Sequence, residues 1–342
     1  MTSHESPVAP FATVVPGYAM RFPHDEGSHP EFRLEWWYVT GWLAGAGGAA
    51  IGFQITFFRA RPVRRTANPS TFAPHHMLIA HAAIADPARG RLQRDQRAAR
   101  AAFELAGAAQ GRTDVWIDDW SFRQQGGRYV ATVAARSFRL ELVFTATQPP
   151  MLQGAAGLSR KGPRAESASY YYSIPHLDAS GTLTRNGSTE TVGGVAWLDH
   201  EWSSSYMDER AVGWDWIGIN LDDGGALMAF RMRDPAGGSF WAGGAYRSAA
   251  GSVQVFAPDT VRFTPLRHWR SSRTGANYPV SWRVSAGGRE IDIEPLFDDQ
   301  ENDTRATTGA VYWEGAVRAL RAGASVGRGY LELTGYWRRL QL

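Results

Sequence analysis

The chain carries the same strand-turn-strand pattern twice, and this repeat limits the folds open to it. Residues 36–43 (WWYVTGWL) resemble residues 214–221 (WDWIGINL), and a glycine-rich turn follows each stretch. The strand-like runs 51–57 (IGFQITF) and 228–233 (MAFRMR) come after those turns. Copies this far apart are not the units of a solenoid, so they predict two domains of one fold. The matched positions are Trp36 with Trp214, Tyr38 with Trp216, Val39 with Ile217, Leu43 with Leu221, and Phe53 with Phe230.

A chain of 342 residues is long enough for two domains with hydrophobic cores. Its hydrophobic content of 44% and its charged content of 20% are typical of a globular protein. The 14 tryptophans exceed what two ordinary cores need, and they suit a wide apolar cavity lined by large flat side chains. Any single tryptophan can equally serve as a cross-strand partner or a core filler.

The charge pattern and the absence of cysteine exclude several classes of function. The net charge is +3, Lys161 is the single lysine, and no basic cluster alternates with aromatic residues, which argues against nucleic-acid binding. Without cysteine there are no disulfides, thiolate metal sites or cysteine nucleophiles. No apolar run is long enough to span a membrane.

Residues 1–17 (MTSHESPVAPFATVVPG) lack the charged and apolar regions of a signal peptide. We therefore expect a cytoplasmic protein, or a periplasmic or secreted one if Met1 replaces a removed signal segment. The sequence does not fix the oligomeric state.

Short runs of β-branched or aromatic residues dominate the chain and predict an all-β protein of antiparallel barrels or sandwiches. Glycine-rich hairpin turns are expected at 44–48, 124–127 and 221–225. Only residues 87–107, rich in charge and alanine, have a helical composition. The predicted strands are 35–43, 50–58, 81–85, 129–134, 138–145, 195–202, 213–221, 226–233, 240–247, 253–257, 278–284, 289–295, 310–316 and 329–338.

The Pro/Gly-rich segment 148–164 is the best candidate for a linker or lid. It divides the chain into a predicted N-terminal domain, residues 1–165, and a C-terminal domain, residues 166–342. The last predicted strand ends at the C-terminus and leaves no tail.

The segment EWWYVTGWL places a carboxylate, Glu35, beside adjacent indoles. Because alternate residues of a strand face opposite sides, Glu35 and Trp37 share one face and Tyr38 lies on the other. If Glu35 points into a tryptophan-lined interior, burial raises its pKa and makes it a proton donor. The alternative is a strand-end glutamate that pairs with Arg33 or Arg59.

The segment LDHEWSSSY (198–206) is the densest polar cluster of the sequence. His200 and Trp202 share one face of the predicted strand, and Asp199 and Glu201 share the other. A histidine beside two carboxylates suits acid–base chemistry, and three ionisable residues in a row are costly in a strand that does not use them. The alternative is an edge strand with an exposed polar face.

Asp215 lies between Trp214 and Trp216 and would point away from both indoles. Its counterpart in the first copy is Trp37, so the two domains differ here. The predicted cross-strand partners of Asp215 are His200, Arg210 and Arg231.

A metal site at His75, His76 and His81 is rejected, because the spacing matches no established zinc pattern and no carboxylate lies at a fitting offset. His81 remains a candidate polar group in a barrel interior. Nucleotide-binding and nucleophile-elbow motifs are absent from the sequence, so no cofactor is expected.

The same motifs resemble the bacterial family that includes carotenoid 1,2-hydratase (hydroxyneurosporene synthase) and secreted AttH-type proteins. The resemblance implies two lipocalin-like β-barrels packed together around a large cavity for an apolar ligand. In the hydratases a His-x-Trp and a nearby aspartate are implicated, which His200 and Trp202 match, with Asp199 or Asp215 as the carboxylate. The matching segments are 21–43, 80–86, 167–183, 194–205, 213–234, 268–282, 312–315 and 329–336.

Two functions follow as hypotheses. The first is a hydratase or related lyase that protonates a bulky terpenoid or carotenoid-like alkene in a tryptophan-lined cavity. The second is a non-catalytic periplasmic carrier of a lipid or apolar metabolite that serves an ABC-type permease; a pericyclase whose cavity only folds a polyene is a third. The candidate catalytic residues are Glu35, His200, Glu201 and Asp215, and the candidate substrate-binding residues are Trp37, Tyr38, Gln54, His81, Tyr171, Trp202, Trp214, Trp216 and Arg231.

Overall fold

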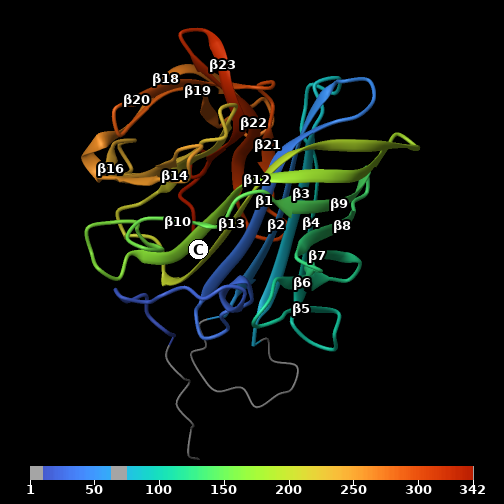
Figure 1. The fold of residues 1–342 in the computed structure, drawn as a ribbon, viewed down its shortest axis with the longest axis horizontal. Coiled ribbons are helices and arrows are strands. Elements are labelled where there is room, and N and C mark those ends of the chain that lie inside the picture. Colours follow the sequence, from blue (N-terminus) through green and yellow to red (C-terminus); the bar gives the residue numbers. More distant parts are fainter. Residues whose placement is uncertain (1–10, 63–74, 342) are drawn as a thin grey trace, which may run out of the picture.

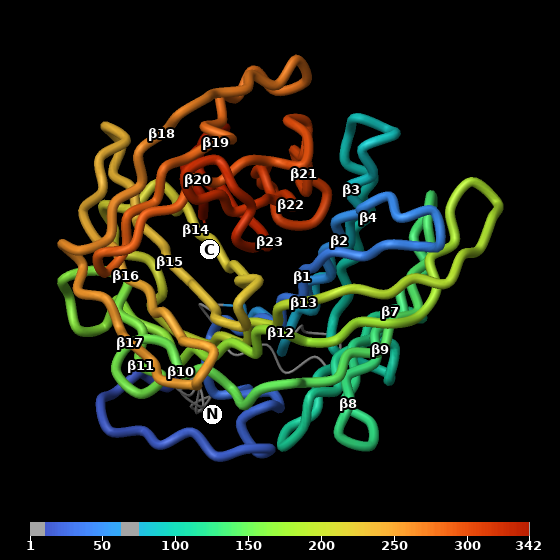
Figure 2. Tube along the Cα trace, turned by 45° about the horizontal axis from the view of Figure 1, so that its top comes forward, coloured from blue at the N-terminus to red at the C-terminus, as the bar shows by residue number. Residues whose placement is uncertain are grey.

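The computed structural model describes residues 11–62 and 75–341 and shows two lipocalin-like antiparallel β-barrels side by side (Figures 1 and 2). The first ten residues, which were analysed above for a signal peptide, lie outside the described residues. Within the described part of the chain, no helix has the length and hydropathy needed to cross a membrane. The only helices there are two short 3-10 turns, η1 (His24–Glu26) and η2 (Pro258–Thr260).

The N-terminal barrel is one 13-stranded sheet with the order β4-β3-β2-β1-β13-β12-β9-β8-β7-β6-β5, in which β10 and β11 also pair with β12. Its strands are β1 (Leu34–Ala44), β2 (Ala50–Ala60), β3 (Met77–Ala85), β4 (Gln93–Arg100), β5 (Ala106–Ala108), β6 (Asp114–Ile117), β7 (Trp120–Gln125), β8 (Arg128–Ala134), β9 (Phe138–Ala146), β10 (Met151–Leu152), β11 (Leu158–Arg160), β12 (Ala168–Arg185) and β13 (Ser188–Ser205).

The C-terminal barrel is a 10-stranded sheet with the order β17-β16-β15-β14-β23-β22-β20-β19-β18, in which β21 pairs with β22. Its strands are β14 (Gly213–Leu221), β15 (Ala226–Arg233), β16 (Ser239–Arg247), β17 (Val253–Phe256), β18 (Val261–Arg270), β19 (Asn277–Ala286), β20 (Arg289–Pro295), β21 (Glu301–Asp303), β22 (Val311–Arg321) and β23 (Ala324–Leu333).

The two sheets share one strand order, which confirms the internal duplication. Strands β1 to β4 occupy the places that β14 to β17 take in the second sheet. In each copy the first strand pairs with the second on one side and with the last strand on the other. The matched segments of the sequence are therefore β1 with β14 and β2 with β15.

Three sequence predictions need correction. The helical composition of 87–107 was misleading, because β4 pairs with β3 at the edge of the described sheet and its charged side chains are only half-buried. Segment 148–164 is not a free linker, since β10 and β11 pair with β12, and the Trp241 indole of the other barrel donates to the Arg160 carbonyl at 2.8 Å. The last strand ends at Leu333, and residues 334–341 run on beyond it.

The hydrogen-bonded sheet of the first barrel continues past the predicted domain division at residue 165. Both β12 and β13 belong to this sheet, and β14 is the first strand of the second sheet. The two long strands lie in the middle of this sheet, between β1 and β9, and residues of both pack against the second barrel (Figure 1).

The barrels contact each other through three pairs of strands, β1 against β23, β2 against β22 and β12 against β14. A cluster of buried aromatic side chains separate from the two barrel cores fills this interface. Hydrogen bonds cross it, from the Trp42 indole to the Gly329 carbonyl at 3.0 Å and from the Asn220 amide to the Ala196 carbonyl at 3.1 Å. The interface is thus packed like a core, which holds the two faces in a fixed relation.

Candidate functional site

A cavity of about 350 Å³ lies between the two barrels, where strands β1, β12 and β13 face strands β14, β22 and β23. Its walls are mostly apolar and aromatic, with a few polar groups among them, as is typical of small-molecule sites. The chemistry-bearing residues that line it are Glu35, Trp36, Tyr38, Arg59, His81, Tyr171, Asp199, Glu201, Tyr206, Trp214, Trp216, Tyr312, Glu314 and Glu332.

Strand alternation decides which side chains reach the cavity. On β13, His200 and Trp202 belong to the interior of the N-terminal barrel, whereas Asp199 and Glu201 point to the interface between the barrels. The register confirms the two faces predicted for this segment, because Asp199 lies opposite Tyr38 and His200 lies opposite Trp37. The polar face is buried against the second barrel and is not the exposed face of an edge strand.

Asp199 is a buried carboxyl group that accepts three hydrogen bonds. The Tyr171 hydroxyl donates to it at 2.7 Å, the Ser173 hydroxyl at 2.5 Å and the Trp197 indole at 2.7 Å. Burial raises the pKa of Asp199 to about 7, because the loss of solvation outweighs the lowering by these donors. A carboxyl group in this state exchanges a proton near neutral pH, as a general acid requires.

Glu201 is balanced by a buried cation. The Lys161 ammonium lies 2.9 Å from Glu201 and donates to the Ser159 hydroxyl at 2.9 Å, while the Ser169 hydroxyl also donates to Glu201. Burial raises the pKa of Glu201 and lowers the pKa of Lys161, although each group opposes the shift of the other. The single lysine of the chain thus lies behind the cavity wall, in a segment that was predicted to be a linker.

Glu314 and Glu332 supply two further carboxyl groups from neighbouring positions of β22 and β23. Burial raises the pKa of both groups, and the charge of Glu332 adds to the effect on Glu314. The Trp214 indole donates to Glu332 at 2.7 Å. Glu332 is only partly buried, whereas Glu314 is 2% exposed. Both carboxyl groups are therefore more readily protonated at neutral pH than an ordinary glutamate side chain.

His81 reaches the cavity from β3 and is neutral. Burial lowers its pKa to about 3, and its ring nitrogens lie 3.0 Å from the Tyr312 hydroxyl and 3.0 Å from the Thr307 hydroxyl. It therefore provides a hydrogen-bonding group to the wall and no positive charge.

Glu35 belongs to a separate polar network inside the N-terminal barrel. Its carboxylate lies 2.8 Å from Arg59, 2.8 Å from His29 and 3.0 Å from His200. Burial by itself raises the pKa of Glu35, but the charge of Arg59 and the hydrogen bonds from the two histidines hold it well below its usual range. Glu35 is buried, as the proton-donor hypothesis required, but its ion pair with Arg59 keeps it deprotonated. Glu35 is therefore a carboxylate and not a proton donor.

The same network contains the atoms of a potential metal site. His29, Glu35 and His200 offer ligand atoms within 4.8 Å of one another. Arg59 already neutralises the carboxylate, and His29 Nδ1 and His200 Nε2 each form a hydrogen bond with it. The His29 ring stacks on Trp202 at 3.8 Å, and the His200 ring stacks on Trp37 at 4.7 Å, as in a packed core. These residues fit a self-contained ion-pair network better than a metal centre.

Asp215 lies in the C-terminal barrel and does not face the cavity. It lies 2.6 Å from Arg231 and 3.1 Å from Arg233, and it accepts a hydrogen bond from the Tyr336 hydroxyl at 2.9 Å. Arg231 was one of its three predicted partners. The Arg231 guanidinium lies over the Trp282 ring, a member of that barrel's core.

The structure thus divides the predicted site residues among three places. Tyr38, His81, Tyr171, Glu201, Trp214 and Trp216 come together at the cavity. The N-terminal barrel contains Trp37, His200, Trp202 and the Glu35 carboxylate, and the C-terminal barrel contains Asp215 and Arg231. Gln54 is also in the N-terminal barrel. It is buried on β2, where its amide donates to the Thr56 hydroxyl at the cavity edge.

Glu314, Glu332, Trp36, Tyr206 and Lys161 were not among the predicted site residues. One signal for Glu332 was present in the sequence, since Leu331-Glu332 near the end of the second copy repeats Leu198-Asp199 near the end of the first. Lys161 offered no such signal, because the Pro/Gly-rich composition of its segment indicated a linker or lid and not a cavity wall.

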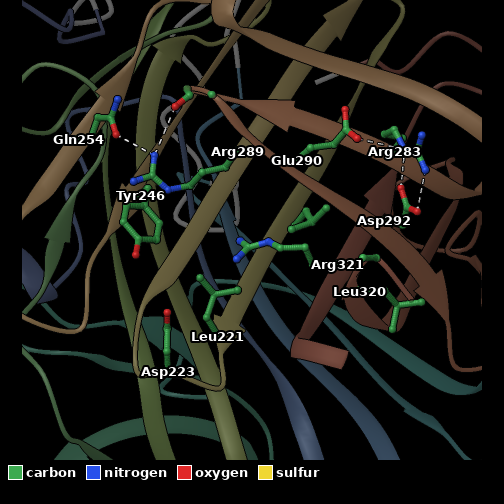
Figure 3. A pocket seen from close by; sticks show the side chains of 14 residues that line it. Leu221, Asp223, Tyr246, Gln254, Arg283, Arg289, Glu290, Asp292, Leu320 and Arg321 are labelled. Atoms are coloured by element: carbon green, nitrogen blue, oxygen red, sulfur yellow. Dashed lines mark hydrogen bonds and ion pairs between the residues drawn. The ribbon is translucent and has the colours of Figure 1, made fainter. Parts of the chain in front are cut away.

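A second hollow of about 960 Å³ lies at one end of the C-terminal barrel (Figure 3). Two of its arginines have partners within the hollow. Arg283 holds Asp292 at 2.7 Å, and Arg289 donates to Gln254 at 2.8 Å and lies over the Tyr246 ring. Of the residues that line this hollow only Leu221 and Ile291 are buried, and none of the predicted site residues lies here. The cavity between the barrels is the better candidate for a functional site.

Comparison with known proteins agrees with the fold. A family model described as AttH-like matches residues 13–336. A crystal structure assigned to AttH from Nitrosomonas europaea is 54% identical, with a TM-score of 0.90 over 95% of this chain and 100% of that one. Kievitone hydratase from Nectria haematococca is 14% identical, with a TM-score of 0.72 over 96% and 97% of the two chains. CghA is 14% identical, with a TM-score of 0.56 over 96% and 95%. No functionally curated protein is significantly similar in sequence.

Proposed function

This chain belongs to the AttH-like family, and from that premise we propose that it is a hydratase-type enzyme that protonates a bulky alkene between its two barrels. One observation carries the proposal: Asp199, with a pKa raised to about 7, faces an aromatic cavity large enough for a small molecule. A fold shared with kievitone hydratase makes hydration the first reaction class to test.

The proposed reaction needs one acid, one base and a wall that tolerates positive charge. Protonated Asp199 donates its proton to one alkene carbon, and the electron pair of the double bond forms the new C–H bond. The neighbouring carbon becomes a cation, which the faces of Trp36, Trp214 and Trp216 stabilise by about 0.5–2 kcal/mol for each contact. Water then bonds to the cation, and Glu332 accepts the proton that the water releases. Proton return from Glu332 to Asp199 through solvent completes the cycle, so that alkene and water give an alcohol.

The expected substrate is an apolar, terpenoid-type alkene, of which a carotenoid end is one example. The apolar wall suits such a molecule, and the partly buried Glu332 provides the side from which water enters. If the protein is instead the carrier of an apolar metabolite, the same cavity holds the ligand and no bond changes.

The test is incubation of the purified protein with a panel of terpenoid alkenes in ¹⁸O-labelled water, followed by mass spectrometry. We expect an alcohol product heavier by one molecule of labelled water, and a rate lowered about 10²–10⁴-fold in Asp199→Asn. Glu141→Gln, an exposed change on the outside of the first barrel, is the control and should keep the full rate. Recovery of bound but unchanged alkene across the panel would instead establish the carrier function.

A further inference from the structure

The cavity between the barrels holds more buried carboxyl groups than buried cationic groups. Glu35 is neutralised by Arg59, and Glu201 by Lys161. Over residues 11–62 and 75–341, the three remaining carboxyl groups of the lining, Asp199, Glu314 and Glu332, form no ion pair. A cluster of acidic groups with so little counter-charge is costly unless the groups are protonated or a cation approaches them.

Two buried polar atoms at the cavity have no hydrogen-bond partner of good geometry in the described part of the chain, Glu314 Oε1 and the Tyr38 hydroxyl. The two groups lie close enough to act on each other's pKa, but they do not complete a well-formed hydrogen bond. The two residues are 2% and 8% exposed, and both line the cavity. Buried polar atoms without a well-formed partner are rare in folded proteins, and Glu314 Oε1 is an acceptor that a donor on a ligand would satisfy.

Several aromatic rings of the cavity wall lie close to one another. The Trp36 and Tyr206 rings meet edge to face at 5.0 Å, the Tyr206 and Trp214 rings at 5.5 Å, and the Tyr38 and Trp216 rings at 5.5 Å. The faces of such rings carry partial negative charge and attract ammonium groups, so an aromatic wall of this kind suits a cationic ligand.

The protein already holds one ammonium group in this wall. Lys161 Nζ lies 4.3 Å from the centre of the Phe230 ring, 4.9 Å from that of Tyr171 and 5.1 Å from that of Tyr206. The interface thus surrounds a buried primary ammonium with three aromatic rings and one carboxylate, that of Glu201. The carboxyl groups on the opposite wall, Glu314 and Glu332, have no equivalent cation among the described residues.

We propose that the cavity binds a protonated amine carried on an apolar body, with the ammonium among Asp199, Glu314 and Glu332 and the apolar part against the tryptophans. The inference rests on the proposed function for the location of the ligand and not for the reaction. An ammonium also resembles the cationic carbon through which alkene protonation passes, so both properties can belong to one site.

Binding of such a cation requires that a carboxyl group lose its proton. Asp199 does so at little cost near neutral pH, because burial sets its pKa at about 7. We therefore expect proton release on binding and an affinity that rises as the pH increases through neutrality. The titratable and charged groups that face this part of the cavity are Tyr38, Arg59, His81, Lys161, Tyr171, Glu201, Tyr206, Tyr312, Glu314 and Glu332.

Three probes of one size test the proposal, namely 1-naphthylmethylamine, 1-naphthalenemethanol and 1-naphthoate. Calorimetric titration of the whole chain in two buffers of different ionisation enthalpy measures both affinity and proton release. We expect the amine to bind at least about tenfold more tightly than the alcohol at pH 8, to release a proton near pH 7, and to lose most of this preference at about pH 5. The naphthoate should bind most weakly.

The variant Glu332→Gln should reduce the preference for the amine over the alcohol, whereas Glu141→Gln on the outer surface should retain it. Equal affinity for amine and alcohol, tighter binding of the naphthoate, or no binding by any probe would each overturn the inference. If the protein hydrates alkenes in the labelled-water experiment but binds the amine and the alcohol equally, only the cation-site proposal is rejected. If it prefers the amine but hydrates no alkene, only the proposed reaction is rejected.

Discussion

Asp199 and Glu332 occupy the same place in the two copies of the fold. Asp199 lies on the last strand of the first barrel opposite Tyr38, and Glu332 lies on the last strand of the second barrel opposite Trp216. The residue before each is a leucine that pairs with Val39 or Ile217. Packing the two copies face to face therefore brings two carboxyl-bearing strands to one cavity. The duplication supplies the site as well as the scaffold.

The stability of the protein should depend on the protonation of Asp199. Because burial raises the pKa of this group from 3.8 to about 7, the folded protein keeps a proton there that the unfolded chain has already lost. The resulting stabilisation is complete below the unfolded pKa and disappears as the pH rises through about 7. We expect the free energy of unfolding to fall more steeply between about pH 5 and pH 8 in the wild type than in Asp199→Asn.

Urea denaturation followed by tryptophan fluorescence across this pH range measures that difference. Groups remote from Asp199 titrate equally in both proteins, so the difference between the two curves reports on Asp199 and on neighbours whose pKa its charge affects, among them Glu332 and Lys161. Parallel curves would show that Asp199 is an ordinary carboxylate in the folded protein.

Strand alternation and the repeat made much of the fold predictable. The predicted strands 213–221, 226–233 and 289–295 coincide with β14, β15 and β20, because regular alternation and glycine turns set their ends. The faces of β13 were also predictable from the period of a strand. By contrast, β4 was missed because an edge strand tolerates a charged, alanine-rich sequence that resembles a solvent-exposed helix.

The site was only partly predictable, for a physical reason. Sequence alternation shows that Asp199 and His200 point in opposite directions, but it does not show which direction leads to a cavity. The inward face of β13 is filled by His29, Glu35 and Trp37, whereas the outward face meets the second barrel. That outcome depends on how two domains pack, which no local pattern encodes.

The Glu35–Arg59 ion pair should be a major contributor to the stability of the N-terminal barrel. Both side chains are at most 3% exposed, so Arg59→Ala leaves a buried carboxylate next to two histidines without its guanidinium. We expect a loss of about 3–5 kcal/mol in the free energy of unfolding, measured by urea denaturation. The control is Arg139→Ala, which removes an exposed pair with Glu141 and should cost less than about 1 kcal/mol. Similar losses in both variants would show that the Arg59 pair is screened by solvent.

Close approach of the barrels should depend on the small size of Gly52. A methyl group at this position would lie 2.5 Å from the Ala316 Cβ and 2.8 Å from the Tyr330 hydroxyl of the other barrel. Gly52→Ala should therefore destabilise the protein by about 1–3 kcal/mol and weaken ligand binding by separating β2 from β22. Gly47→Ala, in the turn of the same hairpin, meets no atom within 4 Å and serves as the matched control. Equal thermal midpoints for the two variants would contradict this account of the interface.

Lys161 and Glu201 should be strongly coupled, because both are buried and, among the described residues, each forms its only ion pair with the other. Lys161→Met leaves Glu201 without its cation, and the carboxyl group must then be protonated or bear the full cost of burial. Adding Glu201→Gln removes that cost, so the double variant should be more stable than Lys161→Met alone. A double-mutant cycle measured by urea denaturation should give a coupling free energy above about 1 kcal/mol, against nearly zero for the exposed Arg283–Asp292 pair. Additive effects at Lys161 and Glu201 would mean that the ammonium is held by its aromatic neighbours and not by the carboxylate, and the pKa of Glu201 would then not depend on the lysine.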